Sequence, residues 1–188
     1  MFISSVLGHK HYITKEKGLI DMREIVTSVY KFEELSEEAQ DTAVESLWDI
    51  NVDYGWWNFI YDEATKIGCQ IEGFDIDRGE CALNLSVDGN SVIKLILANH
   101  GENCDTYKTA LNFKDAMAFA IKAYDEDFEG DPEVAWNLER IITDFQHALT
   151  QDYMKIIREG YEYLTSREVI IETIQCNEYE FTARGKIH

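Results

Sequence analysis

The sequence lacks the short motifs that identify the common classes of enzyme. It contains no GxSxG, no Walker-type phosphate loop and no GxGxxG, so nucleotide hydrolysis and dinucleotide binding have no support. Its cysteines form no CxxC pair and give no sign of a tetrahedral zinc site; they are Cys69, Cys81, Cys104 and Cys176. Free thiols in a reducing cytoplasm are therefore expected.

Long apolar runs are also missing. No stretch approaches the roughly 18 apolar residues that a membrane helix needs. The short apolar run at the N-terminus has no basic region before it, which disfavours a signal peptide. We therefore expect a cytoplasmic protein.

Basic residues are scarce. Lys and Arg together number 17 against 36 Asp and Glu, a formal charge of −19. The acidity is concentrated, because residues 32–80 carry 2 basic and 14 acidic groups, a net charge of 2 − 14 = −12. Such a surface repels the phosphates of nucleic acids and of anionic membranes, so the expected partner is a basic protein surface. Two alternatives remain open: acidity that serves only solubility, and cation binding.

The 188 residues are 45% hydrophobic and 12% aromatic, enough for a substantial core. Residues 1–21 are mildly basic and show no periodicity, which predicts a flexible N-terminal extension. His9 and His11 could bind a metal, but a solvent-exposed tail explains them better. We predict a single α+β domain over residues 22–188.

The most acidic and aromatic stretch is residues 30–68. It predicts the end of a strand over residues 25–32, a helix after the N-cap Ser36, and a second helix over residues 54–67 that ends at Gly68. In the first of these helices, one apolar stripe is expected to be buried; it comprises Ala39, Ala43, Val44, Leu47, Trp48 and Ile50.

The remaining elements follow from periodicity and turn residues. Residues 69–87 read as an antiparallel hairpin, and residues 91–100 favour a helix over a third strand. Apolar spacing predicts a helix over 104–124 and a long helix over 132–163, the latter capped by Asp131. A short helix after Thr165 or Ser166 and a C-terminal strand follow. The fold class is thus α+β and helix-rich, with one small antiparallel sheet made of the hairpin and the N- and C-terminal strands.

A partner-binding surface is predicted in the acidic stretch. Two adjacent tryptophans on a helix lie about 100° apart, so Trp56 and Trp57 cannot both face inward, and one of them could anchor a partner. The carboxylates predicted to surround this anchor are Glu37, Glu38, Asp41, Glu45, Asp49, Asp53, Asp62 and Glu63.

The best enzyme-like alternative is a metal site on the hairpin. Asp75 and Asp77 would alternate onto one face of a strand, and Glu102 could join them around a divalent ion. Acidic residues beside a turn are expected by chance in a chain with 36 carboxylates, and the spacing of an EF-hand loop is absent. We expect no bound metal and no cofactor. The segment from His100 to Cys104 reads as the end of a helix rather than a catalytic pair.

Two stretches carry a resemblance to a known group of proteins. They are YKFEELSEEAQDTAVESLWDINVDYGWWNFIYDEATKIG with the following GFDIDRG, and DYMKIIREGYEYLTSREVIIETIQCNEYEFTARGKI. Together they resemble small acidic proteins encoded by bacteriophages and prophages, whose members look as if they begin near Met22. The group brings no catalytic residues to carry over. A phage origin implies, by analogy, an inhibitor of host defence of the anti-restriction or anti-CRISPR type, some of which imitate DNA.

These observations lead to one functional prediction and two alternatives. The prediction is a non-enzymatic phage accessory protein that inhibits a nucleic-acid enzyme, such as a Cas effector, by binding it stoichiometrically in the host cytoplasm. The first alternative is a metal-dependent hydrolase or small-molecule-binding protein that uses Asp75, Asp77 and Glu102. The second is a structural or regulatory partner of another phage protein. The oligomeric state is left open.

Overall fold

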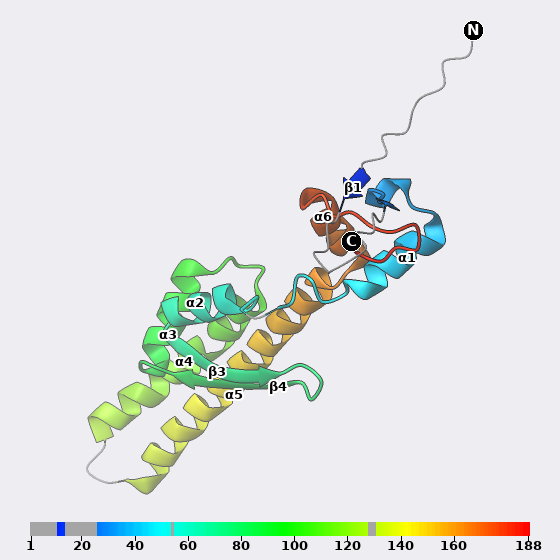
Figure 1. The fold of residues 1–188 in the computed structure, drawn as a ribbon. Helices are drawn as coiled ribbons and strands as arrows, with labels where there is room; N and C mark the ends of the chain where they lie inside the picture. The colour runs from blue at the N-terminus through cyan, green and yellow to red at the C-terminus, as the bar shows by residue number, and fades with distance from the viewer. Residues whose placement is uncertain (1–10, 14–25, 54, 128–130) are drawn as a thin grey trace. The chain divides into compact units, whose positions relative to one another are not determined.

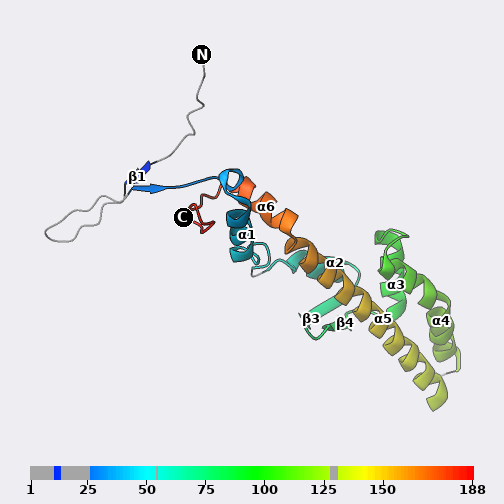
Figure 2. The same ribbon diagram turned by 90° about the vertical axis from the view of Figure 1, so that its right-hand side faces the viewer.

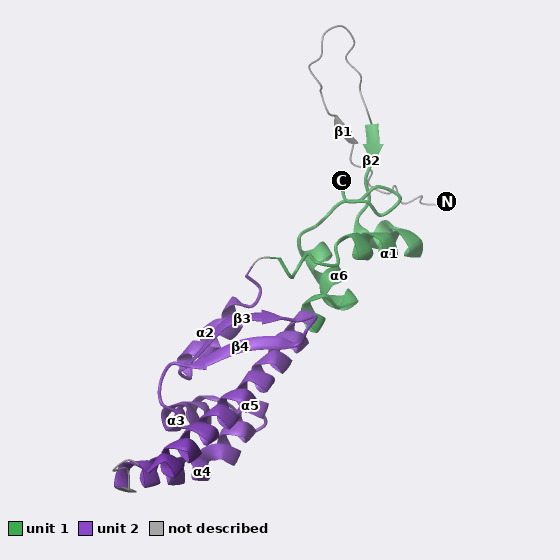
Figure 3. Ribbon diagram, turned by 90° about the horizontal axis from the view of Figure 1, so that it is seen from below, with its two compact units in different colours: residues 1–54, 162–188 green, residues 55–161 purple. Residues whose placement is uncertain are grey.

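The structure, a computed structural model, describes residues 11–13, 26–53, 55–127 and 131–188 (Figure 1). The chain divides into two compact units: unit 1 comprises residues 1–54 and 162–188, and unit 2 comprises residues 55–161 (Figure 3). Helices dominate and the strands form small antiparallel pairs, so the predicted helix-rich α+β class is confirmed. The prediction of one domain over 22–188 stays a prediction.

The described residues of unit 1 form two short strands, a 3-10 turn, two helices and the last residues of a long helix, α5 (Pro132–Leu164). Strand β1 (His11–Ile13) pairs antiparallel with β2 (Val26–Ser28), and a 3-10 turn, η1 (Phe32–Glu34), leads into helix α1 (Glu37–Ser46). Helix α6 (Arg167–Cys176) follows much later in the chain. Of the predicted N-terminal extension, only β1 lies within the described residues; His9 lies outside them.

The core of unit 1 joins α1 to α6. Ala39, Ala43 and Val44 form the buried stripe of α1, and Ile170 and Ile174 form that of α6. Two aromatic rings complete the cluster, because Phe32 and Phe181 meet edge to face with centroids 6.4 Å apart. The apolar spacing of both helices therefore buries one face of each against the other.

Two segments of unit 1 that lie far apart in the sequence, around Tyr30 and Phe181, are joined by backbone hydrogen bonds. The Tyr30 amide donates to the Phe181 carbonyl at 2.8 Å, and the Phe181 amide donates back at 2.9 Å. These bridges are isolated, and β2 pairs with β1. The prediction that the terminal strands join the hairpin in one sheet is therefore wrong for the described residues, since strand partners are chosen by tertiary packing that a local pattern does not encode.

Unit 2 is built on a hairpin and helices. Its elements are α2 (Asn58–Lys66), β3 (Cys69–Asp75), β4 (Glu80–Leu85), α3 (Gly89–Asn99), α4 (Asp105–Asp127) and α5 (Pro132–Leu164). The hairpin pairs Cys69 with Leu85 and Asp75 with Glu80. Helices α4 and α5 run alongside each other (Figure 2). The boundary with unit 1 falls after Tyr161, in the last turn of α5.

One apolar stripe of α5 organises the core of unit 2. Phe145, Leu149, Tyr153 and Ile157 follow at four-residue spacing and are all buried. The same cluster contains the inner side chains of the hairpin and of α2, α3 and α4. The Phe113 ring of α4 contacts Phe145 with centroids 5.4 Å apart. A helical stripe of this kind places one residue per turn on the buried face.

Several predicted boundaries are confirmed and one is displaced. The hairpin, the helix over 91–100 and the two long helices all form, and Asp131 caps α5 by accepting from the Glu133 amide at 2.9 Å. Gly68 ends α2 with a φ of 76°. Helix α2 begins at Asn58, four residues later than predicted. In the described part of the chain, no helix combines the length and the apolar character that crossing a membrane requires.

Candidate protein-binding surface

The acidic face of unit 1 is defined by Glu37, Glu38, Asp41, Glu45, Asp49 and Asp53. All six side chains are exposed, the first four on α1 and the other two in the turns that follow it. Residues 32–54, which belong to unit 1, contain eight Asp and Glu and no Lys, Arg or His. Unit 1 therefore presents a run of negative charge that no basic residue of the same segment interrupts.

Helix α1 begins where the sequence predicts. The Ser36 hydroxyl accepts from the Ala39 amide at 3.3 Å, which satisfies one of the free donors of the first turn. Glu37 and Glu38 follow it, where the helix dipole favours negative charge. Four-residue spacing then aligns Asp41 and Glu45 with Glu37. Like charges at this spacing are destabilising by about 0.2–0.5 kcal/mol per pair, so helix stability alone does not favour the arrangement.

The turns after α1 are held by one asparagine. The side-chain nitrogen of Asn51 donates to the Leu164 carbonyl at 3.1 Å, and its side-chain oxygen accepts from the Thr173 hydroxyl at 2.8 Å. Backbone bonds from Ile50 to Leu47 and from Val52 to Asp49 shape the same turns. Asp49 and Asp53 are thus carried on a segment whose backbone is tied to the rest of unit 1.

One carboxylate of the face is already paired. Arg167 of α6 contacts Asp41 with nitrogen and oxygen 2.6 Å apart, and both side chains remain about half exposed. Within the described residues, no Lys or Arg makes an ion pair with Glu37, Glu38 or Glu45. These three carboxylates are therefore available to an outside cation, whereas Asp41 also serves the contact between α1 and α6.

Trp48 is the apolar side chain that sequence reasoning misplaced. It is 52% exposed, although the helical spacing predicts it in the buried stripe. The reason is that α1 ends at Ser46 and Leu47 leaves the helical conformation, so the helical period stops before Trp48. The signal that could have found this is the recurrence of Asp and Asn from Asp49 to Asp53, which favours turns.

The other four predicted residues lie in unit 2. Trp56 and Trp57 are both partly buried, and their rings contact Phe74 with centroids 5.9 and 5.5 Å away. Each ring thus keeps part of its surface exposed, and the role of either one as a partner anchor stays a prediction. Asp62 and Glu63 are exposed on α2, and Glu63 is paired with Lys66. The ten predicted residues are thus divided between two units.

The hairpin carboxylates do not form the alternative metal site. Asp75 ends β3 and accepts from the Arg78 amide at 2.9 Å, while Asp77 lies in the turn, so the two do not alternate on one strand. Glu102 is exposed beyond the end of α3. Among the residues that the structure describes, no group of three His, Cys, Asp or Glu side chains could hold a metal ion.

The segment after α3 reads as the sequence predicts, as a helix end. His100 is the C-cap, and its amide donates to the Ile96 carbonyl at 2.8 Å.

Comparison of the chain with models of protein families, with curated proteins and with solved structures finds no match. Function is therefore inferred from the residues of the chain.

Proposed function

We propose that the chain is a non-enzymatic binding protein that inhibits a nucleic-acid enzyme stoichiometrically, by covering a basic surface of that enzyme with the acidic face of unit 1. The observation that supports this most is the set of exposed carboxylates on α1, of which Glu37, Glu38 and Glu45 have no cationic partner among the described residues. Closely spaced negative charges can bind a basic surface that normally receives the phosphates of a nucleic acid. They also speed the diffusional association of the two proteins.

Trp48 is proposed as the apolar anchor, in place of Trp56 or Trp57. An exposed tryptophan beside carboxylates suits a binding surface, because most binding energy comes from a few buried aromatic side chains ringed by polar groups. Trp48 has that exposure and lies next to Asp49 in the chain. Its position in unit 1 also keeps the anchor and the six carboxylates in one compact unit.

The likeness to small acidic phage proteins makes a host defence enzyme the proposed target. A restriction enzyme or a Cas effector has the basic nucleic-acid groove that an acidic face can occupy. Such a target places the proposed action in the cytoplasm of the bacterial host. A stoichiometric inhibitor needs no catalytic group, no metal and no cofactor, and inhibition would depend on affinity alone.

The test is a cleavage assay on purified restriction enzymes and Cas effectors with increasing amounts of the chain. We expect cleavage to stop near one copy of the chain per enzyme, and the inhibition to be relieved when excess uncleavable DNA competes for the groove. If no enzyme of this set is inhibited, candidate targets would be captured on the immobilised chain from a lysate of the bacterial host at low salt and then tested in the same assay. Inhibition that excess DNA leaves unchanged would contradict occupation of the groove.

Charge reversal separates this proposal from acidity that serves only solubility. Glu45→Lys changes the acidic face at a side chain that pairs with no described cation, whereas Asp41→Lys would also break the contact with Arg167. We expect Glu45→Lys to weaken binding by about 2 kcal/mol, roughly thirtyfold in Kd. The control is Asp115→Lys, which makes the same charge change on an exposed position of α4 in unit 2. Equal effects of the two variants would favour general acidity.

A further inference from the structure

The last turns of α4 and the first turns of α5 line a groove on unit 2. It has a volume of about 400 Å³ and lies where both helices extend past the hairpin (Figure 1). Helix α4 contributes Phe119 and Ala123 to it, and α5 contributes Val134 and Trp136. The groove shares no residue with the acidic face of unit 1 or with Trp48, so it is independent of the proposed inhibition.

The two aromatic side chains of the groove are mostly exposed. Phe119 is 71% exposed and Trp136 is 61% exposed. Single exposed apolar residues are normal on a protein surface, but two large ones that line the same groove are typical of an interaction site. Tryptophan in particular often contributes much of the binding energy of a protein interface. The groove therefore offers two anchors for the apolar side chains of a partner.

The indole of Trp136 is held in place by Arg140. The guanidinium carbon lies 5.5 Å from the ring centroid, and Nη2 donates to the side-chain oxygen of Asn137 at 3.2 Å. The two helices are also fixed against each other, because the rings of Phe113 on α4 and Phe145 on α5 are in contact. Side chains that are already ordered lose less conformational entropy on binding, so the groove is ready to receive a partner.

Negative charge surrounds the groove. Over residues 119–127 and 131–140 the sequence has 2 basic and 6 acidic residues, a net charge of 2 − 6 = −4. Two of these carboxylates, Asp131 and Glu133, line the groove itself, and none of its described lining residues is Lys, Arg or His. A nucleic acid, an anionic membrane or a second copy of this acidic chain would be repelled there, whereas a basic partner would be attracted.

The two basic residues of these helix ends do not neutralise the lining. Lys122 lies 3.7 Å from Glu126, and the guanidinium of Arg140 rests on the indole ring. Asp131 accepts from the Glu133 amide as the cap of α5, which leaves its charge in place. Among the described residues, neither lining carboxylate makes an ion pair with a Lys or Arg. Both therefore remain available to the cations of a partner.

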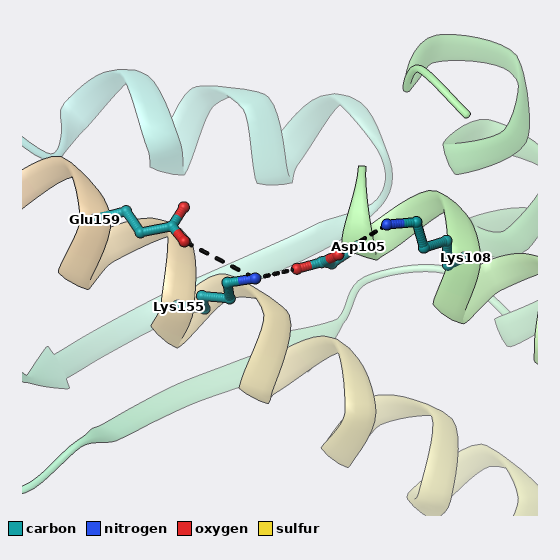
Figure 4. Close-up of polar contacts among 4 residues, drawn as sticks. All are labelled: Asp105, Lys108, Lys155 and Glu159. Atoms are coloured by element: carbon teal, nitrogen blue, oxygen red, sulfur yellow. Dashed lines mark hydrogen bonds and ion pairs between the residues drawn. The ribbon is translucent and has the colours of Figure 1, made fainter. Parts of the chain in front are cut away.

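The surroundings of Asp105, at the opposite end of α4, show the contrast. The nitrogen of Lys155 lies 2.6 Å from Asp105 and 3.8 Å from Glu159, and the nitrogen of Lys108 lies 3.3 Å from Asp105 (Figure 4). The carboxylates there are matched by lysines of the same unit and give no reason to expect a cationic partner. Only the carboxylates of the groove lie beside exposed aromatic rings without such lysines.

We propose that this groove is a second protein-binding surface, which receives an amphipathic helix of a partner protein with large apolar side chains on one face and Lys or Arg beside them. A helix fits because the groove runs between two helices that lie alongside each other, and a third helix packs into such a groove as it does in a bundle. Its apolar side chains would contact Phe119 and Trp136, and its basic ones Asp131 and Glu133.

The test uses three synthetic helical peptides of about 18 residues, or five turns, titrated into the full chain. The first has Leu on one face and Lys on the other, the second has Glu in place of Lys, and the third has Ala in place of Leu. The backbone amide signals of residues 119–127 and 131–140 are followed by nuclear magnetic resonance at about 150 mM salt, where distant exposed charges are screened.

We expect the Leu/Lys peptide to give saturable shifts of these signals with a Kd below roughly 100 μM, and the other two peptides to bind at least about tenfold more weakly. Equal or tighter binding of the Leu/Glu peptide would contradict selection by charge. Equal binding of the Ala/Lys peptide would contradict the aromatic anchors. Absence of saturable shifts in these two ranges would overturn the proposal as a whole.

Two pairs of variants locate the site. Trp136→Ala should weaken binding of the Leu/Lys peptide at least about tenfold, while Leu111→Ala, on an exposed side chain of α4 outside the lining, should not. Glu133→Lys should weaken it about threefold to tenfold, while Glu102→Lys, the same change at an exposed position of unit 2 outside the lining, should have little effect. If Trp136→Ala loses helicity by circular dichroism, the second pair decides. Equal binding by Glu133→Lys and Glu102→Lys would contradict the location.

Discussion

At the scale of single residues, Gly185 lies where the C-terminal segment passes very close to helix α1. Its φ of 77° is strained for any residue with a side chain, and a Cβ there would lie 2.0 Å from the carbonyl oxygen of Ala39 on α1. The C-terminal segment therefore approaches α1 more closely than any residue other than glycine allows.

Gly185→Ala is expected to lower the free energy of unfolding by about 2–4 kcal/mol, from the left-handed backbone and the clash with Ala39 together. Chemical denaturation followed by circular dichroism measures this. Gly101→Ala is the control, because that glycine is exposed and its nearest neighbour, the Cys104 sulfur, would lie 3.9 Å from a Cβ. Similar stability of the two variants would show that the contact at Ala39 is absent.

Asp152 on α5 carries a partly buried carboxylate, one oxygen of which has no hydrogen-bond partner within the described structure. Burial, assisted by Asp105, raises its pKa above the ordinary 3.8, against the opposing effects of Thr109 and Lys155. The folded state then binds more protons than the unfolded state, so this group makes stability fall as the pH rises from the unfolded pKa through the folded one.

Asp152→Asn removes that titration, and we expect the variant to be more stable than the wild type at pH 7. The gain should disappear near pH 3, where the wild-type carboxyl is largely protonated in both states, because this pH lies below the ordinary pKa of an aspartate. Denaturation curves at the two pH values provide the measurement. Asp144→Asn, exposed on the same helix, should show no such gain at pH 7. A less stable Asp152→Asn at pH 7 would contradict the sign.

At the scale of elements, two helices begin after a serine but are capped differently. The Ser36 hydroxyl accepts from the Ala39 amide at the start of α1. At the start of α6, the Ser166 hydroxyl donates backward to the Tyr163 carbonyl at 2.7 Å and makes no capping bond. The two serines look equivalent in the sequence, and only the structure separates them.

Ser36→Ala should cost about 1 kcal/mol of stability, the usual value for a lost N-cap. Ser166→Ala should cost about 0.5 kcal/mol or less, because no helix donor loses its partner. Both values come from chemical denaturation of otherwise identical chains. A larger loss for Ser166→Ala than for Ser36→Ala would reverse the assignment of the caps.

Elements could be predicted from the sequence where local chemistry decides them. The apolar periodicity of α4 and α5, the cap at Asp131 and the left-handed Gly68 are local signals, and each is confirmed. The terminal strands could not be predicted, because a strand is stabilised by whichever partner packs beside it. The extent of α1 was overestimated for a related reason: Leu47 and Trp48 continue the helical spacing, but the Asn51 side chain holds the chain in turns.

The candidate site was predicted in part. The eight carboxylates predicted for the partner-binding surface are all exposed. This follows from their chemistry, because ionised side chains stay in water. The anchor could not be predicted, since the exposure of Trp48 and the partial burial of Trp56 and Trp57 depend on the end of α1 and on the distant Phe74. Closeness in sequence also did not reveal that Asp53 and Asp62 belong to different compact units.

At the scale of the whole molecule, negative charge is the dominant property. Unit 1 holds 8 basic and 16 acidic residues, a net of −8, and unit 2 holds 9 and 20, a net of −11, which sum to −19. Both units are acidic, but in unit 1 four exposed carboxylates gather on α1, and the exposed Trp48 lies in the turn that follows this helix. The proposed function depends on that local arrangement rather than on the total charge.

The most direct test of the central claim is the affinity of the chain for an enzyme it inhibits, measured against salt concentration for the wild type, Glu45→Lys and Asp115→Lys. We predict that affinity falls at least about tenfold between roughly 50 and 200 mM salt, because exposed charges are screened within a Debye length. Glu45→Lys should bind weakly at low salt and show a shallower dependence, while Asp115→Lys should follow the wild type. An affinity that salt and Glu45→Lys both leave unchanged would contradict binding through the acidic face.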